Sequence, residues 1–135
     1  MSYAIAGALQ AAVYQRLRAS SALEALVGEA IHDAVPPGAV TGTFVSLGPE
    51  DARDASDATG GGAEHDFVVS VITDAAGFQT AKLVAAAISD ELLGASLVLA
   101  RGRLVGLWFL RARARRVESG ETRRIDLTFR ARVEI

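Results

Sequence analysis

The chain contains no cysteine among its 135 residues. This absence excludes a disulfide framework and any thiolate metal site, and it fits a reducing compartment. Half of the residues are apolar, and a chain of this length can bury about two thirds of its unfolded surface around one core. The sequence therefore predicts a single domain, residues 1–135, that is stabilised by packing or by partners.

Long hydrophobic runs are absent as well. No apolar stretch approaches the roughly 20 residues that a membrane-spanning helix needs. The opening Met1-Ser2-Tyr3 lacks the basic region and following apolar run of a signal peptide. We therefore expect a soluble protein with no membrane partner and no signal peptide.

The motifs of common catalytic sites are also missing. The glycines at 60–62 lack the Lys-Ser/Thr of a phosphate-binding loop, and there is no Gly-x-Ser-x-Gly elbow. Two pairs, His32-Asp33 and His65-Asp66, offer zinc or iron ligands, but a third ligand does not stand out. We predict no catalytic residue, no cofactor and no metal site. A small metal-dependent enzyme using His32 and His65 stays as a remote alternative.

The two charge signs occupy different parts of the chain. Residues 1–99 hold four basic and twelve acidic side chains, a net charge of −8. Residues 100–135 hold ten basic and four acidic side chains, a net charge of +6, so the sum is the overall −2. Opposite charges on different surfaces favour head-to-tail self-association, or contact of the basic side with an anionic partner.

Apolar spacing predicts three helical segments. Residues about 3–19 form an amphipathic helix, and a short helix follows, with Ser21-x-x-Glu24 as its capping box and Gly28 as its stop. A third helix carries an apolar stripe over residues 81–92 and ends at Gly94. Either Thr73 or Asp74 is expected to cap that helix.

Four extended segments are expected before the C-terminal region: 31–35, closed by Pro36-Pro37-Gly38, then 43–47, 64–73 and 97–99, with a tight turn at Arg101-Gly102. The segment 48–62 is predicted to be an acidic loop that stays mobile until something binds it. Its acids include Asp51, Asp54 and Asp57, which we interpret as an interface with another subunit.

Residues 104–135 are predicted to form a long hairpin that turns at Ser119-Gly120. The expected pairs on its apolar face are Ala114 with Ile125, Ala112 with Leu127, Leu110 with Phe129 and Trp108 with Ala131. Those on the reverse face are Arg113 with Asp126, Arg111 with Thr128, Phe109 with Arg130 and Leu107 with Arg132. The expected fold class is α+β, with a mainly antiparallel sheet packed by two main helices.

This hairpin is long for a small domain. Thirteen extended residues span about 43 Å, whereas a domain of this size has a radius of gyration of about 14 Å. The hairpin should therefore bend sharply or project, and its apolar end at Ala112, Ile125 and Leu127 needs a cover. We hypothesise that a neighbouring copy of the chain supplies it within a ring.

The reverse face of the hairpin carries a row of arginines that has three possible uses. The row consists of Arg111, Arg113, Arg115, Arg130 and Arg132. It could follow nucleic-acid phosphates without reading sequence. It could pair with acids of its own sheet and protect an edge against aggregation. It could also meet the acidic segment of an adjacent subunit, in which case salt would dissociate the oligomer.

The single tryptophan has two possible roles. Trp108, next to Phe109, could anchor an interface, because tryptophan is frequent among binding hot spots. Core packing is the favoured role, because the small Ala131 opposite it leaves room for an indole. Both aromatic residues stay candidates for an interface with another subunit.

The order of these features resembles the tail-completion or tail-terminator proteins of long-tailed bacteriophages and gene transfer agents. The resemblance covers nearly the whole chain, and its stretches are 8–14 with Leu17, 22–28, 31–36, 43–48, 64–66, 81–93, 97–99 and 130–134. Each stretch is mostly core and turn residues, so the resemblance depends on their order and on the total length.

The resemblance implies a non-enzymatic virion component that assembles in the bacterial host cytoplasm. Such proteins typically form a ring of six subunits at the head-proximal end of the tail tube, where they end tube growth and join the head connector or stopper protein. DNA would pass through the lumen without sequence recognition, and the arginine row could face it. The alternative function is a sequence-independent nucleic-acid-binding module. Whether the source is an infectious phage or a gene transfer agent stays open.

Overall fold

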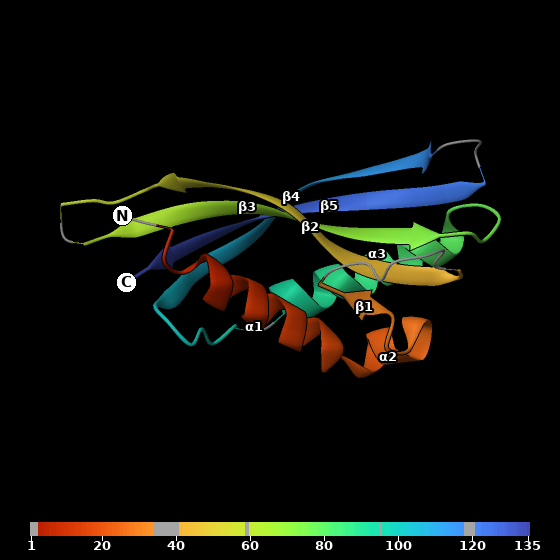
Figure 1. Ribbon diagram of the computed structural model, residues 1–135, viewed down its shortest axis with the longest axis horizontal. Helices are drawn as coiled ribbons and strands as arrows, with labels where there is room; N and C mark the ends of the chain where they lie inside the picture. Colours follow the sequence, from red (N-terminus) through yellow and green to blue (C-terminus); the bar gives the residue numbers. More distant parts are fainter. Residues whose placement is uncertain (1–2, 34–40, 59, 95, 118–120) are drawn as a thin grey trace.

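The computed structural model describes residues 3–33, 41–58, 60–94, 96–117 and 121–135. Three helices lie against one face of a five-stranded sheet with strand order β1-β2-β3-β5-β4 (Figure 1). Only β1 and β2 are parallel. The elements are α1 (Ala6–Arg18), α2 (Ser21–Val27), β1 (Ile31–His32), β2 (Thr43–Asp54), β3 (Gly62–Thr73), α3 (Gln79–Leu93), β4 (Arg103–Val117) and β5 (Thr122–Glu134). The predicted α+β class with a long C-terminal hairpin is confirmed.

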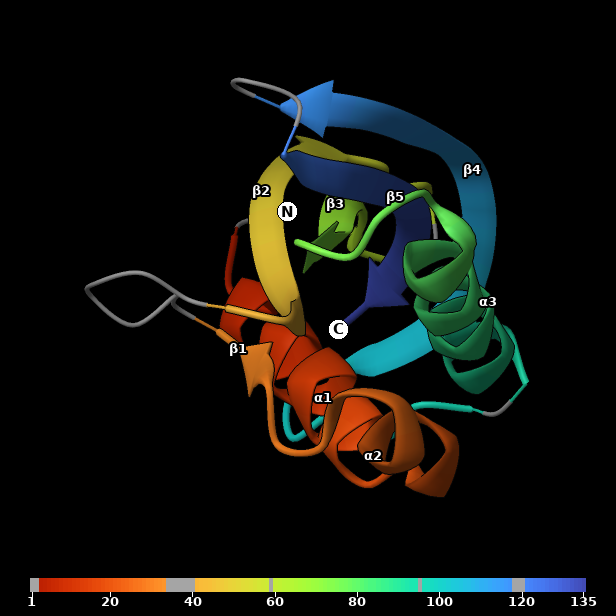
Figure 2. The same ribbon diagram turned by 90° about the vertical axis from the view of Figure 1, so that its right-hand side faces the viewer.

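The core lies between the sheet and the two longer helices. The apolar stripes of α1 and α3 point into it, and seen end-on the sheet curves over them (Figure 2). Fully or almost fully buried members include Leu9, Val13, Leu17, Val84, Ile88, Leu92, Val69, Val71 and Phe129. No helix within the described ranges is long and apolar enough to cross a membrane.

The predicted cap of the second helix is off by one residue. The hydroxyl of Ser20, not Ser21, accepts a hydrogen bond from the backbone N–H of Leu23 at 3.2 Å. Ser20 has an extended backbone and is buried, which suits an N-cap, so Ser21 becomes the first helical residue. Gly28, with a φ of 62°, ends the helix as predicted.

The predicted caps of α3 are wrong. The helix starts after Phe78 without a side-chain cap. The Thr73 hydroxyl instead accepts from the N–H of Ala75 at 3.1 Å, and the Asp74 carboxylate accepts from the N–H of Gly42 at 2.9 Å. The Asp74 bond therefore ties the turn after β3 to the residue that precedes β2, and the Thr73 bond stabilises the turn itself.

The predicted acidic loop is largely a strand. β2 continues to Asp54 and pairs with β3 beyond a register shift between Leu47 and Glu50. Arg53 stabilises this pairing across the strands, because it forms ion pairs with Glu64 at 3.0 Å and Asp66 at 3.3 Å. Composition alone suggested a loop, and the connection between the strands is confined to residues 55–61.

The predicted strand at 97–99 is absent, because these residues belong to no strand of the sheet. Leu97 and Leu99 still point into the core, while Val98 is 89% exposed. The alternation that suggested a strand therefore comes from packing alone. The predicted segment 34–38 and the turn at 119–120 lie outside the described residues.

The predicted hairpin register holds only near its turn. Ala114 pairs with Ile125, Arg113 with Asp126, Ala112 with Leu127 and Arg111 with Thr128. A shift between Phe109 and Arg111, and another between Leu104 and Gly106, then changes the partners. The predicted pairs of Leu107, Trp108, Phe109 and Leu110 are wrong, because an extra residue in β4 rotates that part of the strand.

The cover expected from a neighbour is partly supplied by the chain itself. Ile125 and Leu127 are only 3% and 4% exposed, so this part of the earlier expectation is wrong. By contrast, β4 is the edge strand, and its side chains from Trp108 to Arg116 are all exposed. The unpartnered surface is therefore the outer strand of the hairpin, not the whole ribbon.

Candidate assembly surface

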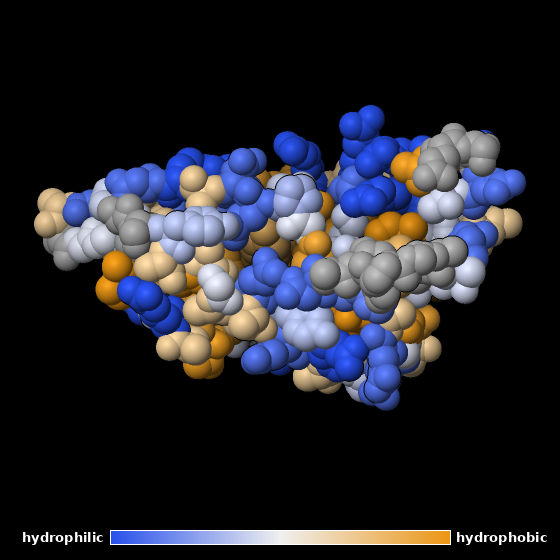
Figure 3. Space-filling view, in the orientation of Figure 1, coloured by the Kyte–Doolittle hydropathy of each residue, from blue (hydrophilic) through white to orange (hydrophobic). Residues whose placement is uncertain are grey.

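The arginine row lies on the sheet face turned away from the helices, which we call the outer face. Cross-strand pairing puts the even-numbered residues 124–132 of β5 there, together with Arg111, Arg113 and Arg115 of β4. In the space-filling view, hydrophilic residues dominate the upper rim, where this face meets solvent (Figure 3).

A groove of about 440 Å³ crosses the turn-proximal half of the outer face. We call it the arginine groove. Its lining residues are Pro49, Val68, Arg111, Arg113, Arg115, Arg124, Asp126 and Thr128. Four guanidinium groups and one carboxylate give it a formal charge of +4 − 1 = +3. Arg124 was missing from the predicted set. Strand alternation could have revealed it, because Arg124 lies on the same face of β5 as Arg130 and Arg132.

Asp126 anchors one side of this groove. Its carboxylate accepts hydrogen bonds from Ser70 at 2.6 Å, Arg124 at 2.8 Å and Arg115 at 3.4 Å. Burial alone would raise the pKa of Asp126, but the hydrogen bonds from Ser70 and Arg124 outweigh it and lower the pKa. Arg113 lies opposite Asp126 as predicted, yet the ion pairs form with Arg115 and Arg124.

Two of the five predicted arginines are engaged by their own chain. Arg130 donates two hydrogen bonds to Asp66, at 2.8 and 3.0 Å, and Arg132 donates to the carbonyl of Ala55 at 2.8 Å. The hydrogen bond from Arg130 lowers the pKa of Asp66, assisted by Arg53. These contacts rigidify the sheet and take Arg130 and Arg132 out of any row of free charges.

Arg111 and Arg113 remain without such a partner. Within the described ranges, no hydrogen bond, ion pair or ring contact is formed by either guanidinium. Both side chains are exposed on the edge strand. The groove therefore presents at least two uncompensated positive charges to whatever docks there.

The single tryptophan, Trp108, is held in place in the N-terminal half of β4. Trp108 pairs with Arg130 on the outer face and is 49% exposed, so the predicted core role opposite Ala131 is wrong. Its ring lies over Gly106, where an added Cβ would come within 2.5 Å of the indole Cη2. The sequence contains a signal for this packing, because Gly106 precedes Trp108 by two residues and therefore lies on the same face of the strand.

Phe109 lies on the opposite, helix-facing side of the strand. It pairs with Phe129 and meets its ring edge-on, with centroids 5.9 Å apart. Phe109, Leu110 and Val105 are all partly exposed, which makes this stretch of the edge strand apolar. An exposed, positioned tryptophan beside apolar neighbours is typical of a protein interface.

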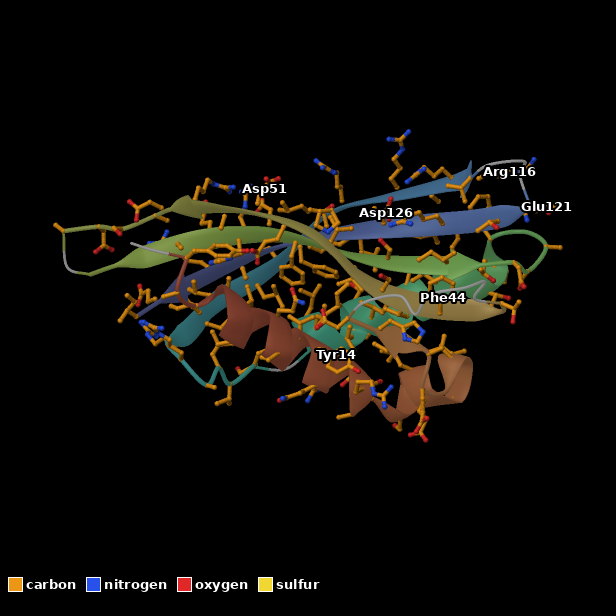
Figure 4. The ribbon with its side chains drawn as sticks, viewed as in Figure 1. Tyr14, Phe44, Asp51, Arg116, Glu121 and Asp126 are labelled. Carbon is orange, nitrogen blue, oxygen red and sulfur yellow. The ribbon has the colours of Figure 1, made fainter. Side chains whose placement is uncertain are left out.

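The predicted acidic residues lie in the hairpin of β2 and β3, at the other end of the molecule. Asp51 is exposed on the same upper side of the sheet as Asp126, far from Arg116 (Figure 4). Asp54 accepts from the Ser56 hydroxyl, which lowers its pKa, and Asp57 accepts from the N–H of Gly60. Asp54 and Asp57 are therefore separated from the arginine groove along the long axis, whereas Asp51 is two residues from Pro49, which lines the groove.

The two histidines do not meet. His65 is fully buried and its Nδ1 lies 3.1 Å from Glu50, while Tyr3 donates to the same carboxylate and stacks on the imidazole. His32 instead contacts the ring of Phe44. In the part of the chain that the structure describes, no group of three His, Asp or Glu side chains is arranged to hold a metal.

An edge strand with an anchored tryptophan and a charged groove suits a protein that works by assembling with others. Known proteins that resemble the chain in sequence and structure are also parts of an assembly. A chain from the native gene transfer agent virion is 75% identical, with a TM-score of 0.93, and the match covers 99% of this chain and all of that one. The protein is of the class of structural tail components. Residues 11–134 match the family model described as tail completion protein gp17, and the chain belongs to that family. No curated protein matches it.

Proposed function

We propose that the protein is a tail terminator that forms a ring, six subunits in the family-typical case, at the head-proximal end of the tail tube. There it ends tube polymerisation and joins the tail to the head connector or stopper protein. Family membership supports the tail location. The observation that carries the proposal is the exposed edge strand β4 with its fixed Trp108, because a monomer has no use for such a surface.

The interface residues we propose come from both ends of the molecule. Trp108 and Phe109 contact another subunit or the tail-tube protein, and so do Asp51, Asp54 and Asp57. Such a ring is part of a virion or phage-like particle, and the likeness to a gene transfer agent chain favours the second. DNA passes through its lumen. If the outer face lines that lumen, Arg111, Arg113 and Arg115 are the candidates for its positive charges, whereas Arg130 and Arg132 are engaged by Asp66 and Ala55.

The decisive experiment is removal of the gene from a particle-producing strain. We expect overlong or headless tails in electron micrographs, and normal particles when the wild-type chain is supplied in trans. Normal tails without the protein would contradict termination. A Trp108→Ala chain tests the interface, because it should fold yet fail to restore normal tails, whereas Arg101→Glu, at an exposed site, should restore them.

The alternative is a sequence-independent nucleic-acid-binding module. The uncompensated Arg111 and Arg113 favour it, since guanidinium groups on alternate residues suit phosphates. Such a module predicts that the purified chain binds duplex DNA of any sequence and loses affinity steeply with salt. Arg111→Glu combined with Arg113→Glu would abolish that binding, and Arg101→Glu serves as a matched control.

A further inference from the structure

We infer that the arginine groove of one copy receives the acidic β2–β3 hairpin tip of the next copy, residues 54–58. The inference rests on the proposed ring and names the contact that builds it. The groove and the tip are different surfaces of one chain, so the contact is head-to-tail. Repeated around an axis, such a contact closes into a ring or extends as a filament.

The groove lacks the negative charge that its arginines require. Asp126 already forms ion pairs with Arg115 and Arg124, so it cannot also neutralise Arg111 and Arg113. The groove is open and its net charge is +3. A docking segment with two or three carboxylates would balance that charge and shield the guanidinium groups from water.

The hairpin tip has the matching composition and position. Residues 54–58 contain two acids, Asp54 and Asp57, and no basic residue, a net charge of −2. Glu50 turns inward to His65, whereas Asp51, Asp54 and Asp57 are exposed. The hairpin extends beyond the helices, at the end opposite to where β4 ends and β5 begins (Figure 1). Asp54 and Asp57 keep their hydrogen bonds within the tip, which stiffens it for docking.

Two other occupants fit less well. A second β4 edge would bring Arg111, Arg113 and Arg115 of two copies against each other, and like charges directly opposite destabilise a strand pair. A DNA backbone would need a longer row, but Arg130 and Arg132 are already bound to Asp66 and Ala55. Asp126 would also face the phosphates.

Cross-linking in assembled particles tests the contact directly, because the natural chain has no cysteine. Pro49→Cys marks the groove and Ala58→Cys marks the tip, and neither removes a charge. With a short bismaleimide, the double variant should give a ladder of multimers on a denaturing gel. Each single variant should give monomers only. Dimers from either single variant, or no ladder from particles of normal shape, would overturn the inference.

Charge reversal provides a second test. Arg111→Glu with Arg113→Glu, or Asp54→Arg with Asp57→Arg, should each lower incorporation into particles about tenfold, and the four changes together should restore most of it. Arg101→Glu and Glu29→Arg, at exposed sites elsewhere, should leave incorporation unchanged. Lack of rescue by the fourfold variant, in a chain that folds, would overturn the contact.

The outcomes separate the contact from the proposed function. If gene removal disturbs tail length but no ladder or rescue appears, the terminator function stands and the head-to-tail contact fails. If removal leaves tails normal, the function itself fails. Loss of DNA retention by the groove variant, with incorporation intact, would assign the arginines to DNA and overturn the inference.

Discussion

At the scale of single residues, one missing Cβ determines where the tryptophan goes. Gly106 leaves the space that the indole of Trp108 occupies on the outer face. Alternation counted from the turn pairs Trp108 with Ala131 and predicts a core residue, because the register shift between Phe109 and Arg111 leaves no signal in the sequence. The aromatic character of the position was predictable, but its exposure was not.

We expect Gly106→Ala to displace the indole, because the new Cβ would lie 2.5 Å from it. The free energy of unfolding should fall by about 1–3 kcal/mol. The emission of the only tryptophan should change at the same time, which urea titration and fluorescence would detect. Gly7→Ala is the control. It lies in α1 with nothing within 4 Å, so stability should stay constant or rise by up to about 1 kcal/mol. An unchanged spectrum for Gly106→Ala would contradict the packing described.

Acid should weaken the fold through Asp66 and Asp126. Hydrogen bonds hold the pKa of each below its ordinary value. Their stabilisation is therefore complete above the unfolded-state pKa of about 3.9 and is lost as the pH falls through the folded-state pKa. Unfolding free energy should decline below about pH 4, and Asp126→Asn should reduce both the stability at pH 7 and that decline. Asp51→Asn, at an exposed site, should change neither. Urea titrations from pH 3 to 7 would check this. If the unfolding free energy fell equally with pH in the wild type, Asp126→Asn and Asp51→Asn, the result would argue against it.

At the scale of elements, the long periodic helices could be predicted, and their ends could not. The apolar stripes of α1 and α3 are visible in the sequence, because helical spacing survives any tertiary context. The caps depend on which of several neighbouring hydroxyls points back at the helix. The second half of β2 was not predicted either, because it depends on pairing with β3 and not on its own composition. Its acids suggested a loop, while Arg53 on the strand pairs with Glu64 and Asp66 of β3.

The two serines before α2 give a sharp test of the cap. Ser20→Ala should lower the free energy of unfolding by about 1 kcal/mol, because the N–H of Leu23 loses its acceptor. Ser21→Ala, one residue later, should change it by less than about 0.5 kcal/mol. Thermal and urea denaturation of the two variants would decide between them, and a larger loss for Ser21→Ala would favour the sequence-based capping box.

At the scale of the whole molecule, the division of charge along the chain becomes a division in space. The antiparallel sheet puts the end of β2 and the start of β3 at one end of the molecule, and the end of β4 and the start of β5 at the other (Figure 1). Asp54 and Asp57 therefore lie too far from Arg111 and Arg113 to neutralise them within one copy. This is why the charge pattern points to contacts between copies rather than to a stabilised monomer.

Salt should accordingly dissociate the assembled protein. The Debye length falls from about 10 Å at 0.1 M to about 3 Å at 1 M ionic strength, so contacts between exposed charges weaken. Light scattering of rings, alone or released from particles, should report a smaller mass as salt rises. The monomer fold, followed by circular dichroism, should be unaffected. A mass independent of salt would mean that the apolar surface around Trp108 and Phe109 suffices for assembly.

The sequence by itself determined the α+β class, the core faces of the helices and the turn-proximal register of the hairpin, because these follow from short-range periodicity and from pairing next to a turn. Only the tertiary structure decided that Trp108 is exposed, that residues 48–54 are a strand and that Arg111 and Arg113 are the uncompensated charges. Each of these depends on strand register and on partners distant in sequence. A single bulge moves the following side chains to the opposite face of the sheet, and the Asp126 carboxylate forms ion pairs with only two of the arginines around it.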